Sequence, residues 1–438
     1  MNKIISKIFA LIFLCSSCSN KTNISEVIPI KYVYGNIEEN TMPILGYVAP
    51  KNNDEEQYKF VNEAGINVLI ASNTYIEGGN NNELLKTLEY ADKYNITILI
   101  KDPYLFESNE DVFLDIFNSR EYKKHQCFGG FFIQDEPQLY EFKNLKKKRE
   151  LFKKYIGDKY MFYINLLPID SYDNERHSDV DYIDYVMNYI MMMDDPKYIS
   201  YDFYGLDKEF PNIKENYFRN LSCVSNLALE NSMAFYNFQL VTEHDVPSMG
   251  FNYRNPTFNE IFWEVNTSIA YGAKGINYFC YQTPSNDSDE WGIYSNRGGS
   301  FINLEGKRTE TYYYCQKINQ YIRSIQSILM NSNRVAMIKK ESYRMTTKLY
   351  GNFVDHYKDV SNMTTNDDAL LSIFDYKKGQ IYYLINTSIV DNAEVKIDFK
   401  NKKSFKLYNI DGNSQTTKPI SSLSFVLEPG HSVLIEPI

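Results

Sequence analysis

The chain of 438 residues is poor in cysteine, and its few cysteines lack the spacing of a metal site. Six occur, of which Cys127, Cys223, Cys280 and Cys315 lie outside the N-terminal segment discussed below. None of these four belongs to a CxxC or Cys/His pattern, so no structural zinc site is expected. We interpret them as small buried apolar residues.

The chain also lacks a net positive charge and a phosphate-binding loop. The net charge of −10 disfavours nucleic acid as a partner, because no basic surface would dominate the electrostatic field. No glycine-rich loop is suited to phosphate, and no His/Asp/Glu set has metal spacing. The sequence therefore predicts no cofactor and no metal.

The N-terminus has an apolar run, but one too short to cross a bilayer as a helix. Lys3 and Lys7 precede the apolar residues Ile8–Leu14, and Ser16 and Ser17 precede Cys18. This order is typical of a signal peptide. It resembles a bacterial lipobox, which implies a signal segment over residues 1–18, acylation of Cys18 and a tether over residues 19–39. The expected location is the bacterial cell envelope, with the chain held to a membrane by its lipid.

Apolar strand-like runs alternate with amphipathic helical patterns over residues 40–330. The eight runs are Pro43–Val48, Ile66–Ala71, Ile96–Ile100, Phe128–Gln134, Tyr160–Leu166, Tyr198–Phe203, Met233–Val241 and Gly275–Tyr281. The helical pattern Thr257–Tyr271 opens with a capping box. This alternation predicts an α/β fold, a (β/α)8 TIM barrel. A doubly wound sheet is the alternative, but its usual glycine-rich turn after the first strand is missing.

From residue 331 to residue 438 the pattern changes to short alternating runs divided by turns such as Asp411-Gly412-Asn413. Such a pattern predicts a C-terminal antiparallel β-sandwich. It contains no cluster of polar residues at strand ends, so we expect an accessory domain.

The segment Cys127–Pro137 is the most informative part of the chain. A run rich in aromatic residues and glycine ends in Asp135 and Glu136, and Pro137 then ends the strand. Carboxylates at the end of an apolar parallel strand lie where such proteins open their active sites. By strand alternation we expect Glu136 to share a face with Phe132 and Gln134.

The ends of the other predicted strands also carry polar and aromatic residues. Carboxylates and amides bind hydroxyl groups, and rings cover the apolar face of a sugar, so the set suits an oligo- or polysaccharide. The candidate binding residues are Tyr47, Asp135, Asn165, Asp202, Tyr204, Gln239, His244 and Tyr281. Trp291, in the predicted loop Thr283–Asn303, is a candidate stacking platform.

Four segments resemble strand-end motifs of barrel glycoside hydrolases: Gly-Phe-Phe-Ile-Gln-Asp-Glu-Pro137, Tyr-Ile-Asn-Leu-Leu-Pro168, Ile-Ser-Tyr-Asp-Phe-Tyr204 and Ala-Tyr-Gly-Ala-Lys-Gly-Ile-Asn-Tyr-Phe279. They are most similar to the β-galactosidase-like proteins of clan A, near family 42. The resemblance implies a retaining glycosidase with Glu136 as acid/base and Glu243 as nucleophile. Where this clan commonly has Asn before the acid, the chain has Asp135.

Two alternatives stay open. Adjacent acids after the fourth strand also occur in substrate-assisted hexosaminidases, where the Asp orients an acetamido group and no second Glu is needed. A catalytically inactive, lipid-anchored glycan-binding protein on the same scaffold is the other, because a fold alone does not prove activity.

Overall fold

The structure is a computed structural model, and it describes most of the chain beyond the N-terminal segment. The described residues are 34–50, 54–71, 82–172, 179–208, 213–247, 250–285, 293–342 and 348–438. Cys18, the predicted signal segment and most of the predicted tether lie outside them, as does Trp291.

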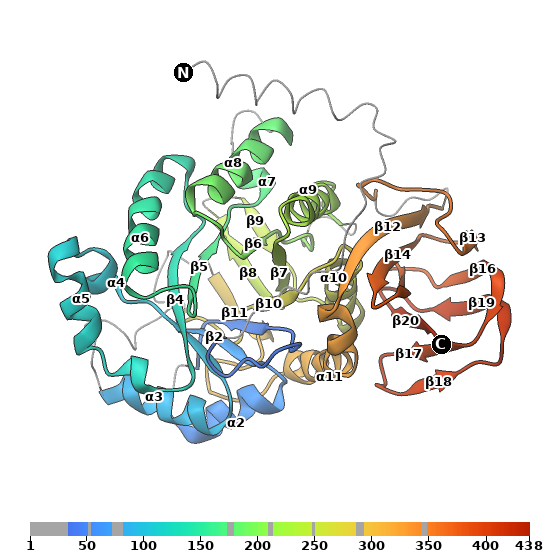
Figure 1. Ribbon diagram of the computed structural model, residues 1–438. Helices are drawn as coiled ribbons and strands as arrows, with labels where there is room; N and C mark the ends of the chain where they lie inside the picture. The colour runs from blue at the N-terminus through green and yellow to red at the C-terminus, as the bar shows by residue number, and fades with distance from the viewer. Residues whose placement is uncertain are drawn as a thin grey trace, which may run out of the picture.

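Eight parallel strands form the predicted (β/α)8 barrel (Figure 1). They are β1 (Ile44–Tyr47), β2 (Val68–Ala71), β3 (Thr97–Ile100), β4 (Phe128–Asp135), β5 (Met161–Asn165), β6 (Tyr198–Asp202), β7 (Ala234–Leu240) and β10 (Gly275–Phe279). Their order is β5-β4-β3-β2-β1-β10-β7-β6. The backbone N–H of Leu166 donates to Ser200 O at 2.8 Å and joins β5 to β6, which closes the barrel.

Helices cover the outside of the barrel. The α-helices are α2 (Glu55–Glu63), α3 (Asn82–Lys93), α4 (Pro103–Phe106), α5 (Glu110–Ser119), α6 (Phe142–Tyr155), α7 (Ile169–Tyr172), α8 (Asp179–Met192), α9 (Asn216–Glu230), α10 (Phe258–Ala270) and α11 (Glu310–Met330). Two 3-10 turns, η1 (Tyr122–Lys124) and η2 (Leu139–Glu141), adjoin β4. Thr257 and Glu260 form the predicted capping box of α10.

Five of the 38 tyrosines are buried in the interior of the barrel: Tyr34, Tyr47, Tyr163, Tyr198 and Tyr236. Residues of one parity along each strand face this interior, and residues of the other parity face the helices. The ring of Tyr198 stacks between Tyr163 and Tyr236, with ring centroids 5.6 and 5.1 Å away. This layer fills the barrel, so the space above it is the place for a ligand.

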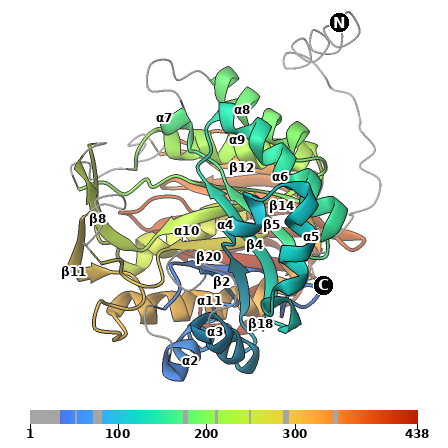
Figure 2. The same cartoon turned by 90° about the vertical axis from the view of Figure 1, so that its left-hand side faces the viewer.

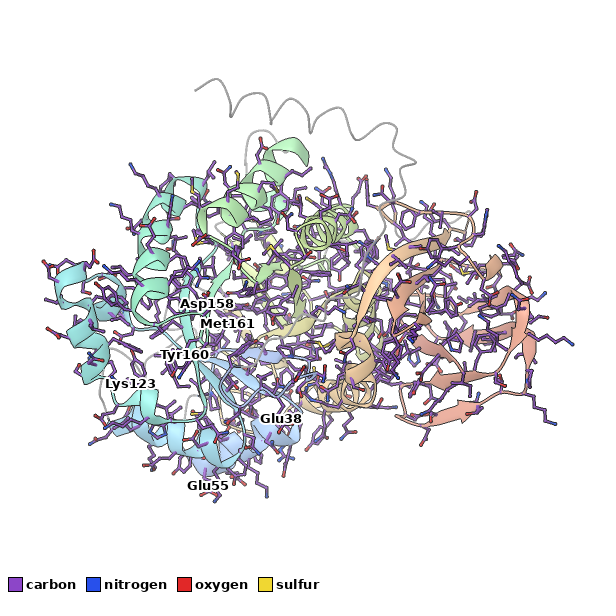
Figure 3. All side chains as sticks on the ribbon, in the orientation of Figure 1. Glu38, Glu55, Lys123, Asp158, Tyr160 and Met161 are labelled. Atoms are coloured by element: carbon purple, nitrogen blue, oxygen red, sulfur yellow. The ribbon has the colours of Figure 1, made fainter. Side chains whose placement is uncertain are left out.

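The described chain begins with a segment that closes the opposite end of the barrel. Tyr34 and Ile37 are buried in the same interior cluster, although both lie in the predicted tether. The hydroxyl of Thr97, the first residue of β3, contacts Tyr34 O at 3.5 Å. A cavity of about 150 Å³ beside Tyr34 is lined in part by Asp158, Tyr160 and Met161, which lead into β5 (Figure 3).

A small sheet of three strands follows β7 and β10, in the order β11-β8-β9. Its strands are β8 (Thr242–Val246), β9 (Phe251–Tyr253) and β11 (Ile293–Gly299). Figure 2 shows β8 and β11 together at the left edge of the molecule. The sequence predicted a loop where β11 lies; its pairing with β8 makes it a strand.

The C-terminal antiparallel strands form the predicted sandwich-like pair of sheets, beside α10 and α11 in Figure 1. One sheet has the order β12-β14-β15-β20-β17-β18 and the other β13-β16-β19. The strands are β12 (Ser332–Lys340), β13 (Val360–Thr365), β14 (Ala369–Tyr376), β15 (Gly379–Asn386), β16 (Ala393–Lys403), β17 (Phe405–Tyr408), β18 (Ser414–Thr416), β19 (Ile420–Leu427) and β20 (Ser432–Pro437).

The larger sheet is attached to the barrel through α10. Trp263 is fully buried there, and its indole N–H donates to Thr387 O at 2.9 Å. The hydroxyl of Tyr383 donates to Asn266 Oδ1 at 2.6 Å. Because Tyr383 also belongs to the main core, the two parts share one hydrophobic cluster rather than meeting across a polar linker.

Candidate active site

A cavity of about 380 Å³ opens where β4, β5, β6 and β7 end. Carboxylates and aromatic rings from different strands and from the small sheet meet in it. Its lining residues are Tyr47, Asp135, Glu136, Asn165, Pro168, Asp170, Ser171, Asp202, Phe203, Tyr204, Lys214, Phe238, His244, Val246, Phe251, Tyr253 and Phe279. The carboxyl ends of barrel strands are where active sites of this fold lie.

A β-bulge in β4 directs Asp135 into the cavity. Phe132 is opposite Tyr163 and Asp135 is opposite Asn165, but the register shifts between Phe132 and Gln134. The extra residue reverses the alternation beyond it. Gln134 therefore points away and its Nε2 donates to Glu141 Oε1 at 2.7 Å. The expectation that Gln134 and Phe132 share a face is wrong for this reason.

Glu136 reaches the same cavity through an unusual backbone conformation. Its φ is +44°, in the left-handed region that a residue with a side chain seldom adopts. Its N–H donates to Asn165 O at 2.8 Å, which holds this conformation against the neighbouring strand. Strained backbone of this kind concentrates at functional sites. Glu136 as a residue is exposed at the cavity, so a substrate can reach it, although surrounding protein atoms crowd its carboxyl group.

Hydrogen bonds fix the two aspartates. Tyr47 donates to Asp135 Oδ2 at 2.9 Å. Asn165 Nδ2 donates to Asp135 Oδ1 at 3.1 Å and to Asp202 Oδ1 at 2.7 Å. The hydroxyl of Ser200 donates to Asn165 Oδ1 at 3.0 Å, which sets the orientation of that amide. The two aspartates therefore flank the amide of Asn165, next to Glu136.

The three clustered carboxyl groups bind protons more tightly than isolated acids. Burial, followed by the charges of Asp202 and Asp135, raises the pKa of Glu136 well above its usual range. Burial and the charge of Asp135 raise the pKa of Asp202 to about 7, and burial also raises the pKa of Asp135. The like charges of Glu136 and Asp202 disfavour ionisation of both groups together, so the arrangement favours retention of a proton.

An aromatic wall faces these acids. The ring of His244 lies 4.7 Å from that of Tyr253, 5.2 Å from that of Phe279 and 5.3 Å from that of Tyr294. His244 Nδ1 is 3.1 Å from Thr242 O. A carbonyl oxygen only accepts, so Nδ1 carries the proton and Nε2 is an acceptor. Burial lowers the pKa of His244 to about 4, which keeps the ring neutral.

Six of the predicted binding residues meet in this cavity: Tyr47, Asp135, Asn165, Asp202, Tyr204 and His244. Two others do not line it. Gln239 Nε2 donates to Ser268 on α10 at 3.2 Å, because the even-numbered residues Tyr236 and Phe238 of β7 face the barrel interior. Tyr281 is fully buried against Phe301, with ring centroids 5.4 Å apart.

Glu243, the predicted nucleophile, does not line the cavity. Its neighbour His244 does, and successive residues of a strand point to opposite sides. Glu243 instead forms an ion pair with Lys208 at 3.0 Å, and Lys208 also pairs with Asp245 at 2.7 Å. The structure therefore does not bring Glu243 and Glu136 together.

The sequence reasoning missed several residues of the cavity. Phe238 and Phe279 belong to predicted strands, and the alternation of those strands was the available signal. Phe251 and Tyr253 lie in β9, a strand of three residues that no periodic pattern indicated. Asp170 and Lys214 come from segments after β5 and β6; Lys214 is paired with Asp207 at 3.3 Å.

One group among the described residues combines potential metal ligands: Asp92, His125 and Cys127, near the start of β4. Asp92 already accepts from the Cys127 N–H at 2.6 Å and contacts His125 Nδ1 at 2.8 Å. The Cys127 thiol contacts Leu88 O at 3.4 Å, and burial raises its pKa, which disfavours the thiolate form. We interpret the group as a structural contact that joins the end of α3 to the start of β4 through hydrogen bonds.

No protein-family model and no curated protein matches this chain. Solved structures do match. A glycoside hydrolase family 5 protein from Bacteroides vulgatus is 12% identical with a TM-score of 0.51, over 90% of this chain and 89% of that one. The α-amylase of Anoxybacillus is 11% identical with a TM-score of 0.50, over 91% of this chain and 98% of that one. These likenesses show the fold.

Proposed function

We propose that this protein is a glycoside hydrolase and that Glu136 is its proton donor. One observation carries the proposal: Asp135, Glu136 and Asp202 meet at the strand ends of a barrel, in a cavity walled by aromatic rings. A protonated, accessible carboxyl group is what protonation of a glycosidic oxygen requires. The solved structures of similar fold are described as a glycoside hydrolase and an α-amylase, which supports this reaction class.

In the proposed reaction Glu136 gives its proton to the leaving oxygen as the glycosidic bond breaks. Positive charge then develops on the sugar ring, and whichever of Asp135 and Asp202 is ionised stabilises it electrostatically. Tyr204, Tyr253 and Phe279 supply aromatic rings for the apolar face of the sugar. Once Glu136 is ionised, it can take a proton from the water that completes hydrolysis.

The resemblance to retaining β-galactosidase-like enzymes adds Glu243 as nucleophile. A retaining pair of carboxyl groups is spaced about 5–5.5 Å apart across the sugar. Glu243 is turned toward Lys208 and away from the cavity, so this mechanism requires β8 to rearrange when substrate binds.

A substrate-assisted reaction on a 2-acetamido sugar is the second candidate. Among the described residues, the carboxylates that line the cavity are Asp135, Glu136, Asp170 and Asp202, and no glutamate besides Glu136 is among them. Substrate assistance needs no protein nucleophile. Asp135, held by Tyr47 and Asn165 beside the acid, is placed to accept the acetamido N–H.

Turnover of a panel of nitrophenyl glycosides tests the proposal, with neutral hexosides and N-acetylhexosaminides included. Turnover that Glu136→Gln abolishes supports a glycosidase; binding without turnover of any glycoside supports the glycan-binding alternative. Accumulation of a glycosyl-enzyme with a fluorosugar, located by peptide mapping on Glu243, supports the two-glutamate mechanism. Activity confined to N-acetylhexosaminides without a trapped intermediate supports substrate assistance.

The proposal extends to location: the chain is attached to a bacterial membrane through acylated Cys18. The order of basic, apolar and small residues before Cys18 supports it. In the part of the chain that the structure describes, no helix is both long and apolar enough to cross a membrane. Tyr34 lies at the end of the barrel opposite the cavity, so the anchor would hold the protein by its far end. Unchanged membrane attachment of Cys18→Ala would contradict this proposal.

A further inference from the structure

We propose that a buried hydrogen-bond network inside the barrel keeps the proton of the site on Glu136 by fixing the direction of the Asn165 amide. This inference rests on the proposed function and deepens it, because it assigns positioning residues to the proposed proton donor. The network consists of Tyr163, Ser200 and Asn277, which are at most 1% exposed and do not line the cavity. We call these three residues the interior network.

The interior network joins three barrel strands to the acids. Asn277 lies in β10, Tyr163 in β5 and Ser200 in β6. Asn277 Nδ2 donates to the hydroxyl oxygen of Tyr163 at 3.0 Å and to Ser200 Oγ at 3.3 Å. The two hydroxyl oxygens are 2.7 Å apart. Ser200 then donates to Asn165 Oδ1 at 3.0 Å, so the network ends on the amide that lies between the two aspartates.

The direction of every hydrogen bond in the interior network follows from the Asn277 amide. Its Nδ2 only donates, so Tyr163 gives its hydrogen to Ser200, and Ser200 gives its own to Asn165 Oδ1. A reversed Asn165 amide would donate to Ser200 instead. One hydroxyl hydrogen of the Tyr163 and Ser200 pair would then have no acceptor among the described residues, and an unpaired donor is costly in a buried interior. The network therefore holds both N–H bonds of Asn165 toward the aspartates.

The fixed amide acts differently on the three acids. One N–H of Asn165 donates to Asp135 Oδ1 at 3.1 Å and the other to Asp202 Oδ1 at 2.7 Å. Burial raises the pKa of both aspartates, and these hydrogen bonds counteract the rise because they favour the ionised carboxylates. Burial and the charges of Asp202 and Asp135 raise the pKa of Glu136. The network thus favours ionised aspartates and leaves the proton on Glu136.

Other titratable groups face the three acids as well. Those that line the cavity are Tyr47, Asp170, Tyr204, Lys214, His244 and Tyr253, and the charge of Lys101 acts on Asp135. Among the described residues, the Ser200 side chain forms hydrogen bonds only within the network and to Asn165. A substitution of Ser200 therefore reaches the acids through Asn165.

Ser200→Ala is the direct test, because it removes the donor that holds Asn165 Oδ1. The amide can then turn its oxygen toward the aspartates, where only a protonated carboxyl group pairs with it. The aspartates keep their protons to higher pH, the negative charge beside Glu136 falls, and Glu136 releases its proton at lower pH. For an alkyl glycoside of the sugar favoured in the nitrophenyl panel, the alkaline limb of kcat/KM should move roughly 0.5–1 pH unit toward lower pH, the effect of one hydrogen bond. Ser200→Thr keeps the hydroxyl group and should restore most of the native profile.

Two tyrosines of the same stack supply a second variant and a matched control. Tyr163→Phe removes the hydrogen that Ser200 accepts and leaves the Asn277 contact at 3.3 Å, so it should move the limb in the same direction by a smaller amount. Tyr198→Phe removes the hydroxyl of the adjacent ring, whose centroid is 5.6 Å away and which donates to Phe162 O at 2.8 Å outside the network. This control should leave the limb in place. Thermal unfolding identifies any variant that does not fold, and Tyr163→Phe then takes the place of Ser200→Ala.

A carbon NMR titration of the labelled carboxyl groups gives a readout without turnover. The signal of Glu136 is identified by its absence from the spectrum of Glu136→Gln. Titration of this signal at lower pH in Ser200→Ala than in the native protein, with no change in Tyr198→Phe, supports the proposal. An unmoved titration and an unmoved limb, with only a general loss of rate or stability, would overturn it and leave the glycosidase proposal intact. If no glycoside is turned over, the proposed function fails, and the titration still decides whether the interior network sets the pKa of Glu136.

Discussion

Inward and outward residues alternate along the strands on both sides of the barrel mouth, but the inward residues are polar on one side and aromatic on the other. On the side of β4, β5 and β6, the inward positions at the strand ends carry Asp135, Asn165 and Asp202. On the side of β7 and β8, the inward positions carry Phe238 and His244, and the polar Gln239 and Glu243 point away. A residue reaches a substrate only if its position in the strand faces the barrel interior, and the polarity of the strand end alone does not decide this.

The carboxylates on the two sides also differ in their charged partners. Glu243 has Lys208 as a cationic partner at 3.0 Å. The acids on the other side accept from the hydroxyl of Tyr47 and the amide of Asn165, and the charge of Lys101 acts on Asp135. Carboxylates grouped in this way retain protons, because ionisation of one group disfavours ionisation of the next. The acidic side is therefore the side equipped for proton transfer.

Substitution of one glutamate on each side tests this comparison most strongly. Glu136→Gln keeps the shape and removes the proton, so kcat on substrates with poor leaving groups should fall roughly 10²–10⁴-fold. Glu243→Gln should cost less than about threefold, the level of a weak surface ion pair. Steady-state kinetics on both variants measure this. Equal and large losses would restore Glu243 to the catalytic pair.

The pH dependence of kcat/KM gives the next largest expected effect. Because the pKa of Glu136 is raised well above its usual range, the acid keeps its proton to a higher pH than an ordinary glutamate does. Activity should hold up to that raised pKa and then decline about tenfold per pH unit above it. The decline should be absent from the residual activity of Glu136→Gln. A profile that instead rises into the alkaline range would argue against a proton donor.

The barrel itself was predictable from the sequence because its strands are long apolar runs. Seven of the eight expected runs contain a whole barrel strand, the eighth ends one residue before β4 does, and their polar ends identify the mouth. The bulge in β4 was not predictable, since no residue between Phe132 and Gln134 departs from a regular strand pattern. The bulge reverses the inward and outward directions just before Asp135 and Glu136. The outward direction of Gln239 has a different origin, because β7 is regular and its even-numbered residues Tyr236 and Phe238 face the interior.

The small sheet was also beyond sequence reasoning. Strands as short as β9 carry too little periodicity to be recognised, and β8 is polar along most of its length. Pairing with β11 shapes this region, and that pairing connects residues about fifty positions apart. Tyr253 consequently enters the cavity from a segment that looked like a connecting loop.

His244 tests what the aromatic side contributes. His244→Phe keeps a ring against Tyr253 and Phe279 and removes the acceptor Nε2 that the Thr242 contact leaves free. If Nε2 accepts a hydroxyl group of the sugar, kcat/KM should fall roughly 3- to 12-fold, the value of one neutral hydrogen bond. A series of deoxy substrates measures it: the one that lacks the contacted hydroxyl group should show no further loss in the variant. Equal losses on every substrate would indicate a packing defect instead.

Substitution of Asp202 should give the smallest effect, and this effect should appear in the thermal stability of the protein as well as in its rate. Its pKa of about 7 in the folded protein exceeds its ordinary value of 3.8. Between pH 3.8 and pH 7 the folded protein therefore holds a proton that the unfolded chain releases, so the contribution of Asp202 to folding stability is full at acid pH and is lost as pH rises through 7.

Asp202→Asn cannot ionise and should raise Tm by roughly 1–4 °C at pH 8, with no gain at pH 4. Thermal unfolding at the two pH values measures this, with Glu243→Gln as the control that should not gain at pH 8. A variant that loses stability equally at both would show that the Asp202 carboxylate is already paired, and the clustered acids would then lack the stored proton on which the comparison rests.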